Sequence, residues 1–137
     1  MSQLIIYTQD NGTVAIIRPT EEALAIYGID AIAKKDVPAG KPFSIVDAAT
    51  IPSDRTFRNA WKGDLTVDMP KAVNITKERL RAERAPLLIA QDVLMARAQE
   101  TGASTVAIVA EKNRLRDVTK LADAPNITLE QLKALAV

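Results

Sequence analysis

The longest patterned stretch of the sequence runs from Asp68 to Gly102, "DMPKAVNITKERLRAERAPLLIAQDVLMARAQETG". It begins with an Asp at the N-cap position and a Pro in the first turn and ends at a Gly, which are common start and stop signals of a helix. Apolar residues recur every seven positions within it, namely Val73, Leu80, Leu87 and Leu94. This spacing predicts one long helix whose apolar stripe must pack against another element.

Pro86 lies inside this stretch and removes one backbone hydrogen bond. Because the apolar stripe resumes in register beyond it, we expect a kink rather than the end of the helix. A second helical stretch, "STVAIVAEKNRLRDVTKLAD", follows the short connection "ETGAS", so we expect two antiparallel neighbouring helices. Thr128 then has the position of an N-cap for a small terminal helix.

The beginning of the chain reads as a β-hairpin followed by short helices. In "LIIYTQDNGTVAIIRP", two runs rich in Ile and Val flank Asn11-Gly12, which predicts a two-residue turn. Thr20 is expected to cap a short helix that ends at Gly28, and Asp30 to cap a second short turn. The segment "PFSIVD" is expected to form a further strand.

The stretch "IPSDRTFRNAWKGD" contains Phe57 and the chain's only tryptophan, Trp61. The two aromatic residues share a face in a helix and in a strand, so the state of residues 54–61 stays open, and we favour a small hairpin. Large aromatic side chains bury much surface, so we expect both rings to be buried. We interpret them as structural anchors that pin the N-terminal part to the start of the long helix.

These patterns predict an α+β protein. Residues 1–67 form a small N-terminal α+β part with a β-hairpin, short helices and further short strands. Residues 68–137 form an antiparallel helical hairpin and a short terminal helix. A chain of 137 residues is long enough to hold a hydrophobic core without disulfides or metal ions.

Composition limits the function. The chain has no cysteine and no histidine, so thiolate metal sites and the commonest general base are excluded. The aspartates lie beside turn residues, where capping is their usual role, and we expect no catalytic, cofactor or metal site. An enzyme using carboxylates alone would need a metal ion. The sequence also shows no signal peptide and no membrane span, which favours a cytosolic protein.

The basic residues offer an alternative function as a nucleic-acid-binding regulator, carried by Arg55, Arg58, Lys77, Arg81 and Arg84. Eighteen cations against seventeen anions give a net charge of +1, which counts against strong attraction to nucleic acid or membranes. Glutamates interleave with these cations, as on a solvated helix face. The alternative stays open because one large basic patch would form if residues 51–64 folded over the helix start.

The apolar stripe favours an interaction protein. A two-helix hairpin cannot cover all sides of its helices, and the run "PLLIAQDVL" is apolar over more than half of the circumference. The excess must meet the N-terminal part, another subunit of a homo-oligomer, or a client protein.

Three stretches, "AIAKKDVPAGKPFSIVDAATIPSDRTFRNAW", the long-helix segment and "EKNRLRDVT", resemble a family of small proteins of tailed bacteriophages and prophages. Genes of this family commonly lie near tail and tail-fibre genes. The C-terminal pattern, "R-x-x-R-x-P-L-L" followed by "K-x-x-L-R-D", also resembles the helical part of phage tail assembly chaperones. The resemblance implies a phage tail or tail-fibre protein as partner. It also implies a location in the host cytoplasm during assembly, or in the tail of the virion, and it carries over no catalytic residue.

We therefore predict a partner-binding surface on the helical hairpin. The seam between the helices and the contact face that extends from it are assigned to Leu80, Leu87, Leu88 and Leu94. Arg81 and Arg84 are expected to orient the partner.

Overall fold

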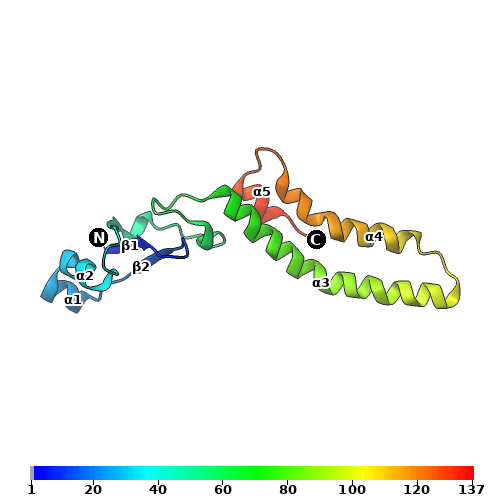
Figure 1. Cartoon of the computed structure of the whole chain (residues 1–137), viewed down its shortest axis with the longest axis horizontal. Helices are drawn as coiled ribbons and strands as arrows, with labels where there is room; N and C mark the ends of the chain where they lie inside the picture. Colours follow the sequence, from blue (N-terminus) through cyan, green and yellow to red (C-terminus); the bar gives the residue numbers. More distant parts are fainter. Residues whose placement is uncertain (1) are drawn as a thin grey trace. The chain divides into compact units, whose positions relative to one another are not determined.

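The computed structural model of the chain describes residues 2–137, which divide into two compact units between Asp68 and Met69 (Figure 1). The first unit holds a β-sheet and short helices, and the second is helical. The predicted α+β class is confirmed. The division falls one residue after the predicted end of the N-terminal part at residue 67.

The first unit has a three-stranded antiparallel sheet made of β1 (Gln3–Thr8), β2 (Val14–Ile17) and β3 (Phe43–Asp47). Strand β1 lies in the middle, with Ile5 paired to Ile17 on one side and to Ile45 on the other. Successive side chains of a strand point to opposite faces, so Ile5 belongs to one face and Leu4 and Ile6 to the other. All three are buried, which requires cover on both faces of the sheet.

The loop between β1 and β2 differs from the predicted two-residue turn. The backbone N–H of Gln9 donates to the carbonyl of Thr13 at 2.8 Å, which leaves a three-residue loop between them. Gly12 has a φ of 83°, whereas Asn11 does not adopt the positive φ that a two-residue turn requires. The Asn11 side chain instead accepts hydrogen bonds from the N–H and the hydroxyl of Thr13, which favours the longer loop.

Two short helices, α1 (Glu21–Tyr27) and α2 (Ile29–Asp36), cover the Ile5 face of the sheet. The predicted cap of α1 is confirmed, because the Thr20 hydroxyl accepts a hydrogen bond from the Ala23 N–H at 3.2 Å. Gly28 ends α1 with a φ of 77° and is also the N-cap of α2. The prediction that Asp30 caps the second helix is therefore wrong, since Asp30 lies within its first turn.

The opposite face of the sheet is covered by the segment after β3, where Trp61 packs against Ile6 and Val14. This segment contains two 3-10 turns, η1 (Ala48–Thr50) and η2 (Arg58–Ala60). Residues 62–66 form a tight loop closed by a single antiparallel bridge between Trp61 and Val67. The expected small hairpin is thus reduced to one bridge, with residues 58–60 in a 3-10 turn rather than a strand.

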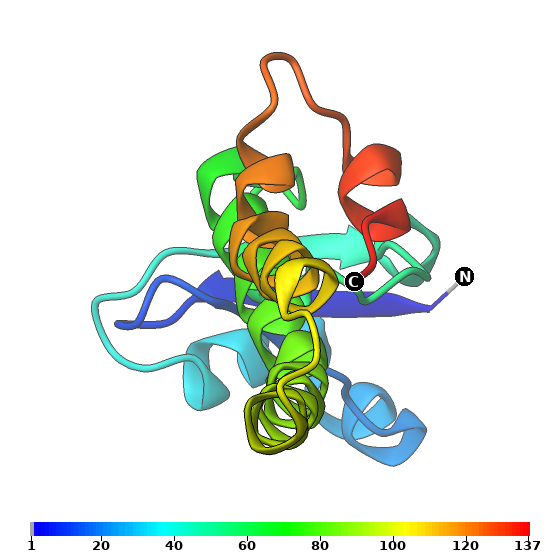
Figure 2. The ribbon, with the colours of Figure 1, turned by 90° about the vertical axis from the view of Figure 1, so that its right-hand side faces the viewer.

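The second unit consists of α3 (Met69–Thr101), α4 (Val106–Asp117), the 3-10 segment η3 (Val118–Asp123) and α5 (Leu129–Ala134). Helices α3 and α4 lie side by side, as Figures 1 and 2 show, and form the predicted hairpin. Helix α3 continues through Pro86. The predicted cap at Thr128 is confirmed, because its hydroxyl accepts from the Gln131 N–H while the Gln131 side chain accepts from the Thr128 N–H.

Long basic side chains of α3 tie the later elements to it. Arg79 donates through Nη2 to the carbonyls of Leu132 and Leu135, at 3.1 and 2.8 Å, at the end of α5. Lys77 forms an ion pair with Asp123 of η3, at 2.7 Å. These bonds fix the last segments of the chain onto the first half of α3.

Candidate functional site

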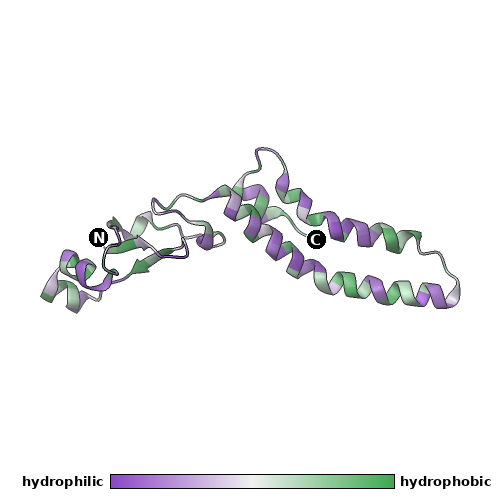
Figure 3. Cartoon of the chain, viewed as in Figure 1, coloured by the Kyte–Doolittle hydropathy of each residue, from purple (hydrophilic) through white to green (hydrophobic). Residues whose placement is uncertain are grey.

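The distal half of the hairpin, residues 85–96 of α3 and 105–110 of α4, is rich in apolar residues (Figure 3), and many of these residues are exposed. Its exposed large side chains, with their exposed fractions, are Leu87 (41%), Ile89 (65%), Val93 (47%), Leu94 (45%), Val106 (76%) and Val109 (42%). Within these two ranges, Asp92 is the only residue that carries a charge. Apolar helices of this kind are normally buried.

These side chains are exposed because two helices can cover only the sides that face each other. Leu80 and Leu115 are fully buried where α3, α4 and η3 pack together. Ile89 lies nine residues after Leu80, which places it about half a turn around the helix at roughly 100° per residue. The apolar side chains of the distal half therefore point to several sides of the hairpin.

Leu87 and Leu94 define one of these sides, which we call the leucine side. They continue the seven-residue row that includes the buried Leu80. At Leu80, η3 and α5 pack on the neighbouring part of α3, as the bonds of Lys77 and Arg79 show. No comparable element covers Leu87 and Leu94 within the described residues, and both are exposed.

A second side is marked by an ion pair between Asp92 of α3 and Lys112 of α4, at 2.5 Å. Ile89 lies three residues before Asp92, and Val109 lies three residues before Lys112, so both flank the pair. We call this the ion-pair side. Ile89 follows Leu87 by two residues, about 200° around the helix, so the two sides are distinct.

The predicted partner-binding residues divide into two groups. Leu80 is buried in the seam and Leu88 is half-buried, whereas Leu87 and Leu94 are exposed and available for contact. The sequence reasoning missed the exposed residues outside the seven-residue row, which are Ile89, Val93, Val106 and Val109. For Ile89 and Val93 the signal was present in the run "PLLIAQDVL", which is apolar on more than one side.

The two arginines expected to orient a partner have different surroundings. Arg84 donates through Nη1 to the carbonyls of Leu115 and Arg116, at 3.3 and 2.8 Å, and so holds the end of α4. Arg81 is exposed, with Glu78 at 3.8 Å. It lies six residues before Leu87, about 120° around the helix, so it does not lie on the leucine side.

The remaining basic residues considered for nucleic-acid binding are also engaged within their own units. Arg55 and Arg58 lie over the Trp61 ring, 6.0 and 5.7 Å from its centre, and belong to the first unit. Lys77 is paired with Asp123 in the second unit. These contacts use the cations locally, which weakens the case for a dedicated phosphate-binding surface.

The two predicted anchor residues are buried, with Phe57 6% and Trp61 2% exposed. Trp61 packs on the sheet within the first unit. Its burial is confirmed, and the proposed role of both rings at the start of α3 stays a prediction.

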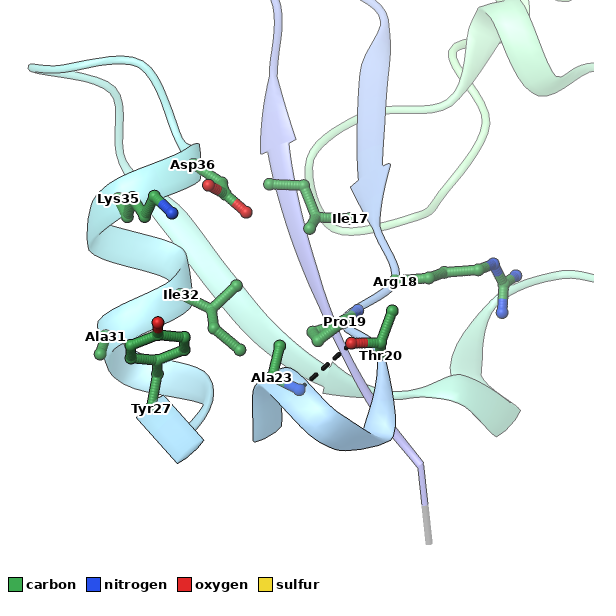
Figure 4. A pocket seen from close by; sticks show the side chains of 10 residues that line it. All are labelled: Ile17, Arg18, Pro19, Thr20, Ala23, Tyr27, Ala31, Ile32, Lys35 and Asp36. Carbon is green, nitrogen blue, oxygen red and sulfur yellow. Dashed lines mark hydrogen bonds between the residues drawn. The ribbon is translucent and has the colours of Figure 1, made fainter. Parts of the chain in front are cut away.

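A hollow of about 270 Å³ opens in the first unit between the end of β2, α1 and α2 (Figure 4). Ile17 and Ile32 line it, and Arg18 points away from it in Figure 4. The Thr20 hydroxyl at its edge is already used to cap α1. The hollow has room for an apolar group and is slightly smaller than the usual ligand pocket.

The shifted pKa values belong to exposed groups. Hydrogen bonding and charge attraction from Lys41 lower the pKa of Asp10. The hydroxyl and the N–H of Thr66 donate to Asp64 and lower the pKa of its carboxyl group. Arg114 lowers the pKa of Glu111 in the same way. These shifts keep the carboxyl groups charged at neutral pH, whereas a general acid or base has its pKa near the working pH.

Within residues 2–137, no three acidic, histidine or cysteine side chains gather closely enough to hold a metal ion. None of the helices described is long and apolar enough to cross a membrane.

Comparison of the chain with protein-family models, with curated proteins and with solved structures finds no match.

Proposed function

We propose that the chain is a non-enzymatic protein that binds another protein through the leucine side of its helical hairpin. The observation that carries this proposal is the exposure of Leu87 and Leu94 in line with the buried Leu80. Contiguous exposed apolar surface typically marks an interaction site in a protein that is otherwise well packed.

The leucine side has the shape of an unfinished helical bundle. Near Leu80, α5 adds a third helix to the α3–α4 pair, and its last carbonyls are held by Arg79. Further along, Leu87 and Leu94 repeat the same seven-residue spacing without a third helix. A helical segment of a partner with its own apolar stripe fits this position, because helices in a groove bind through such spaced anchors.

The proposed partner is a phage tail or tail-fibre protein. Support for this assignment comes from the resemblance of the sequence to small proteins of tailed phages and to tail assembly chaperones. A chaperone would cover its client's apolar surface only during assembly, while a minor tail component would keep the contact in the virion. Both roles use the same surface.

Co-expression with the tail and tail-fibre proteins encoded in the same genome tests the proposal. We expect one of them to co-purify with the chain and to be lost with Leu94→Asp, because a charge in the contact would be buried without a partner. Leu121→Asp is the matched control, since Leu121 is similarly exposed but lies in η3. Binding that survives Leu94→Asp, or the absence of any tail-protein partner, would contradict the proposal.

Two further measurements separate the remaining roles. Mass spectrometry of purified particles distinguishes a virion component, which is present in them, from a chaperone, which is found only in lysate. Binding to nucleic acid that weakens steeply as the salt concentration rises would support the alternative function as a regulator.

A further inference from the structure

We infer that the outer edge of β3 binds an extended segment of another protein, which adds a fourth strand to the sheet and places one apolar side chain in a hollow beside α2. This site belongs to the first unit and the leucine side to the second, so the inference goes beyond the proposed function.

The backbone of β3 has unused hydrogen-bonding groups along its outer edge. Among the residues that the structure describes, β3 has a neighbouring strand on one side only, which is β1. The N–H of Ala48 donates to the carbonyl of Ser2 at 2.8 Å, in the same register as the β1–β3 pairs. Bonded and non-bonded pairs alternate along an antiparallel ladder, so every second residue counted back from Ala48 bonds to β1. Phe43 and Ile45 lie at the alternate positions, and their N–H and C=O groups therefore point away from β1.

This edge is more open than the edge formed by β2. Within residues 2–137, no element bonds to the outward backbone groups of Phe43 and Ile45. Phe43 is exposed and Ile45 half-buried. On β2, by contrast, Val14 is buried in a cluster against which Leu65 packs. An open strand edge selects an extended chain as its partner, because only an extended chain matches the row of donors and acceptors.

A hollow of about 180 Å³ lies beside the beginning of β3. Its apolar walls include Ala33 and Val37 of α2, together with Ala39 and Phe43. Phe43 faces Tyr7 across the ladder, which places it on the side of the sheet that α1 and α2 cover. Residues directly opposite each other in a ladder direct their side chains to the same face, so the partner residue that bonds to Phe43 directs its side chain toward this hollow. The volume suits one side chain rather than a whole ligand.

The charges at the hollow indicate a second feature of the segment. Lys34 and Lys41 also line the hollow. Lys41 pairs with Asp10 at 2.5 Å, whereas Lys34 has no ion pair with any residue of the described part of the chain. A carboxylate near the apolar side chain of the partner would complement Lys34. The site therefore fits an extended segment in which apolar and acidic residues occur together.

A second copy of the chain does not supply such a segment through its own β3. On the relevant face, Ile45 packs in the core with Ile5, and Phe43 lines the hollow of its own copy. The Asp47 carboxylate accepts a hydrogen bond from the Ala49 N–H. Two β3 strands paired edge to edge would therefore leave both hollows without an apolar side chain.

Selection from a displayed library of random short peptides, with the full chain as bait, tests the inference. We expect the enriched peptides to combine apolar and acidic residues in a pattern compatible with a strand. The enriched peptide is then synthesised and titrated into the chain labelled with nitrogen-15. The amide signals of Phe43 and Ile45 should shift and their hydrogen exchange should slow, while the amide of Ile16 at the β2 edge should not change.

Filling the hollow should block the peptide. We expect Ala39→Phe to weaken binding by about tenfold or more, because the apolar anchor of the peptide loses its place. Ala31→Phe is the matched control, since Ala31 is also exposed but lines the larger hollow beside β2. Far-UV circular dichroism checks that both variants keep their fold.

A charge reversal tests the acidic residue of the peptide separately. Lys34→Glu should weaken binding, because it places like charges together. Lys35→Glu is the control one position away on α2, since Lys35 is equally exposed but lines the larger hollow. It should have the smaller effect.

Three results would overturn the inference: no enriched peptide, equal weakening by Ala39→Phe and Ala31→Phe, or signal shifts at β2 instead of β3. Shifts of Phe43 and Ile45 that depend on the concentration of the chain alone would also overturn it, since they would show a second copy at this edge. Leu94→Asp should leave peptide binding unchanged. The failure of this inference is therefore distinguishable from the failure of the proposed function.

Discussion

At the scale of single residues, Trp61 is the largest of the fully buried side chains among the described residues. It is 2% exposed and packs against Ile6 and Val14 on the face of the sheet that α1 and α2 do not cover. The loop at residues 62–66 returns the chain to Val67 beside the ring, and Leu65 and Val67 pack against the same cluster. Arg55 and Arg58 above the ring shield it further from water.

Replacement of this ring should strongly reduce the stability of the protein. We expect Trp61→Ala to lower the free energy of unfolding by about 3 to 5 kcal/mol, because it leaves a large cavity that the sheet cannot fill. Denaturant titration measures the change. Tyr27→Ala is the control, since Tyr27 is 65% exposed and its loss should cost little. A change below about 1 kcal/mol for Trp61→Ala would show that the ring does not carry the packing described here.

Asp64 provides a second prediction at this scale. Its pKa is lowered chiefly by the Thr66 hydroxyl, which donates at 2.5 Å. We expect Thr66→Val to raise this pKa toward its ordinary value, whereas Thr66→Ser should keep it low. An NMR pH titration of the Asp64 carboxyl group measures both. The sign follows from the lowered pKa: the bond stabilises the loop above the unfolded pKa and is lost as the pH falls through the folded pKa.

At the scale of elements, arginines rather than apolar contacts alone fix the ends of the helical segments. Arg79 holds the end of α5 and Arg84 holds the end of α4, each by donating to backbone carbonyls that a helix leaves unpaired. The sequence indicated where these helices lie but not this use of the cations. In the sequence the same residues resemble a solvated charged face, because the carbonyls they bind are 31 to 56 positions away.

Loss of one such bond should release one element. We expect Arg79→Met to destabilise the second unit by about 1 to 3 kcal/mol, because the carbonyls at the end of α5 lose a charged donor. Compared with the parent chain, the variant should show faster hydrogen exchange in residues 129–134, and this increase should be larger than any increase in α4. Arg81→Met is the control two positions away, since Arg81 is exposed and has only a long contact to Glu78. Equal effects of the two variants would contradict the role given to Arg79.

At the scale of the whole molecule, near-zero net charge coincides with exposed apolar surface. The chain has a net charge of +1 and an isoelectric point near 8.0. Charge repulsion between molecules is therefore weak where exposed apolar side chains can associate. This combination favours association through the exposed apolar surface, as the proposed partner contact requires.

The solubility of the protein should depend on its net charge and on its exposed apolar surface. We expect the purified chain to be least soluble near pH 8, and the double variant Leu87→Glu/Leu94→Glu to be more soluble there, because it removes apolar contact and adds negative charge. Precipitation by ammonium sulfate measures both. Glu100→Gln with Glu130→Gln shifts the net charge without changing the hairpin's apolar surface, and should not raise solubility in the same way. A double leucine variant no more soluble than the parent chain would argue against exposed leucines.

The sequence alone determined the class of fold and most of the element boundaries, because capping and periodicity act between residues a few positions apart. Helices begin or end through such bonds at Thr20, Gly28 and Thr128. Of the predicted seven-residue row, only Leu80 is fully buried in the seam. The turn at Asn11-Gly12 was mispredicted because Thr13 competes for the asparagine side chain. Only the tertiary structure decided which apolar side chains remain uncovered, since exposure depends on where η3 and α5 fold back onto α3.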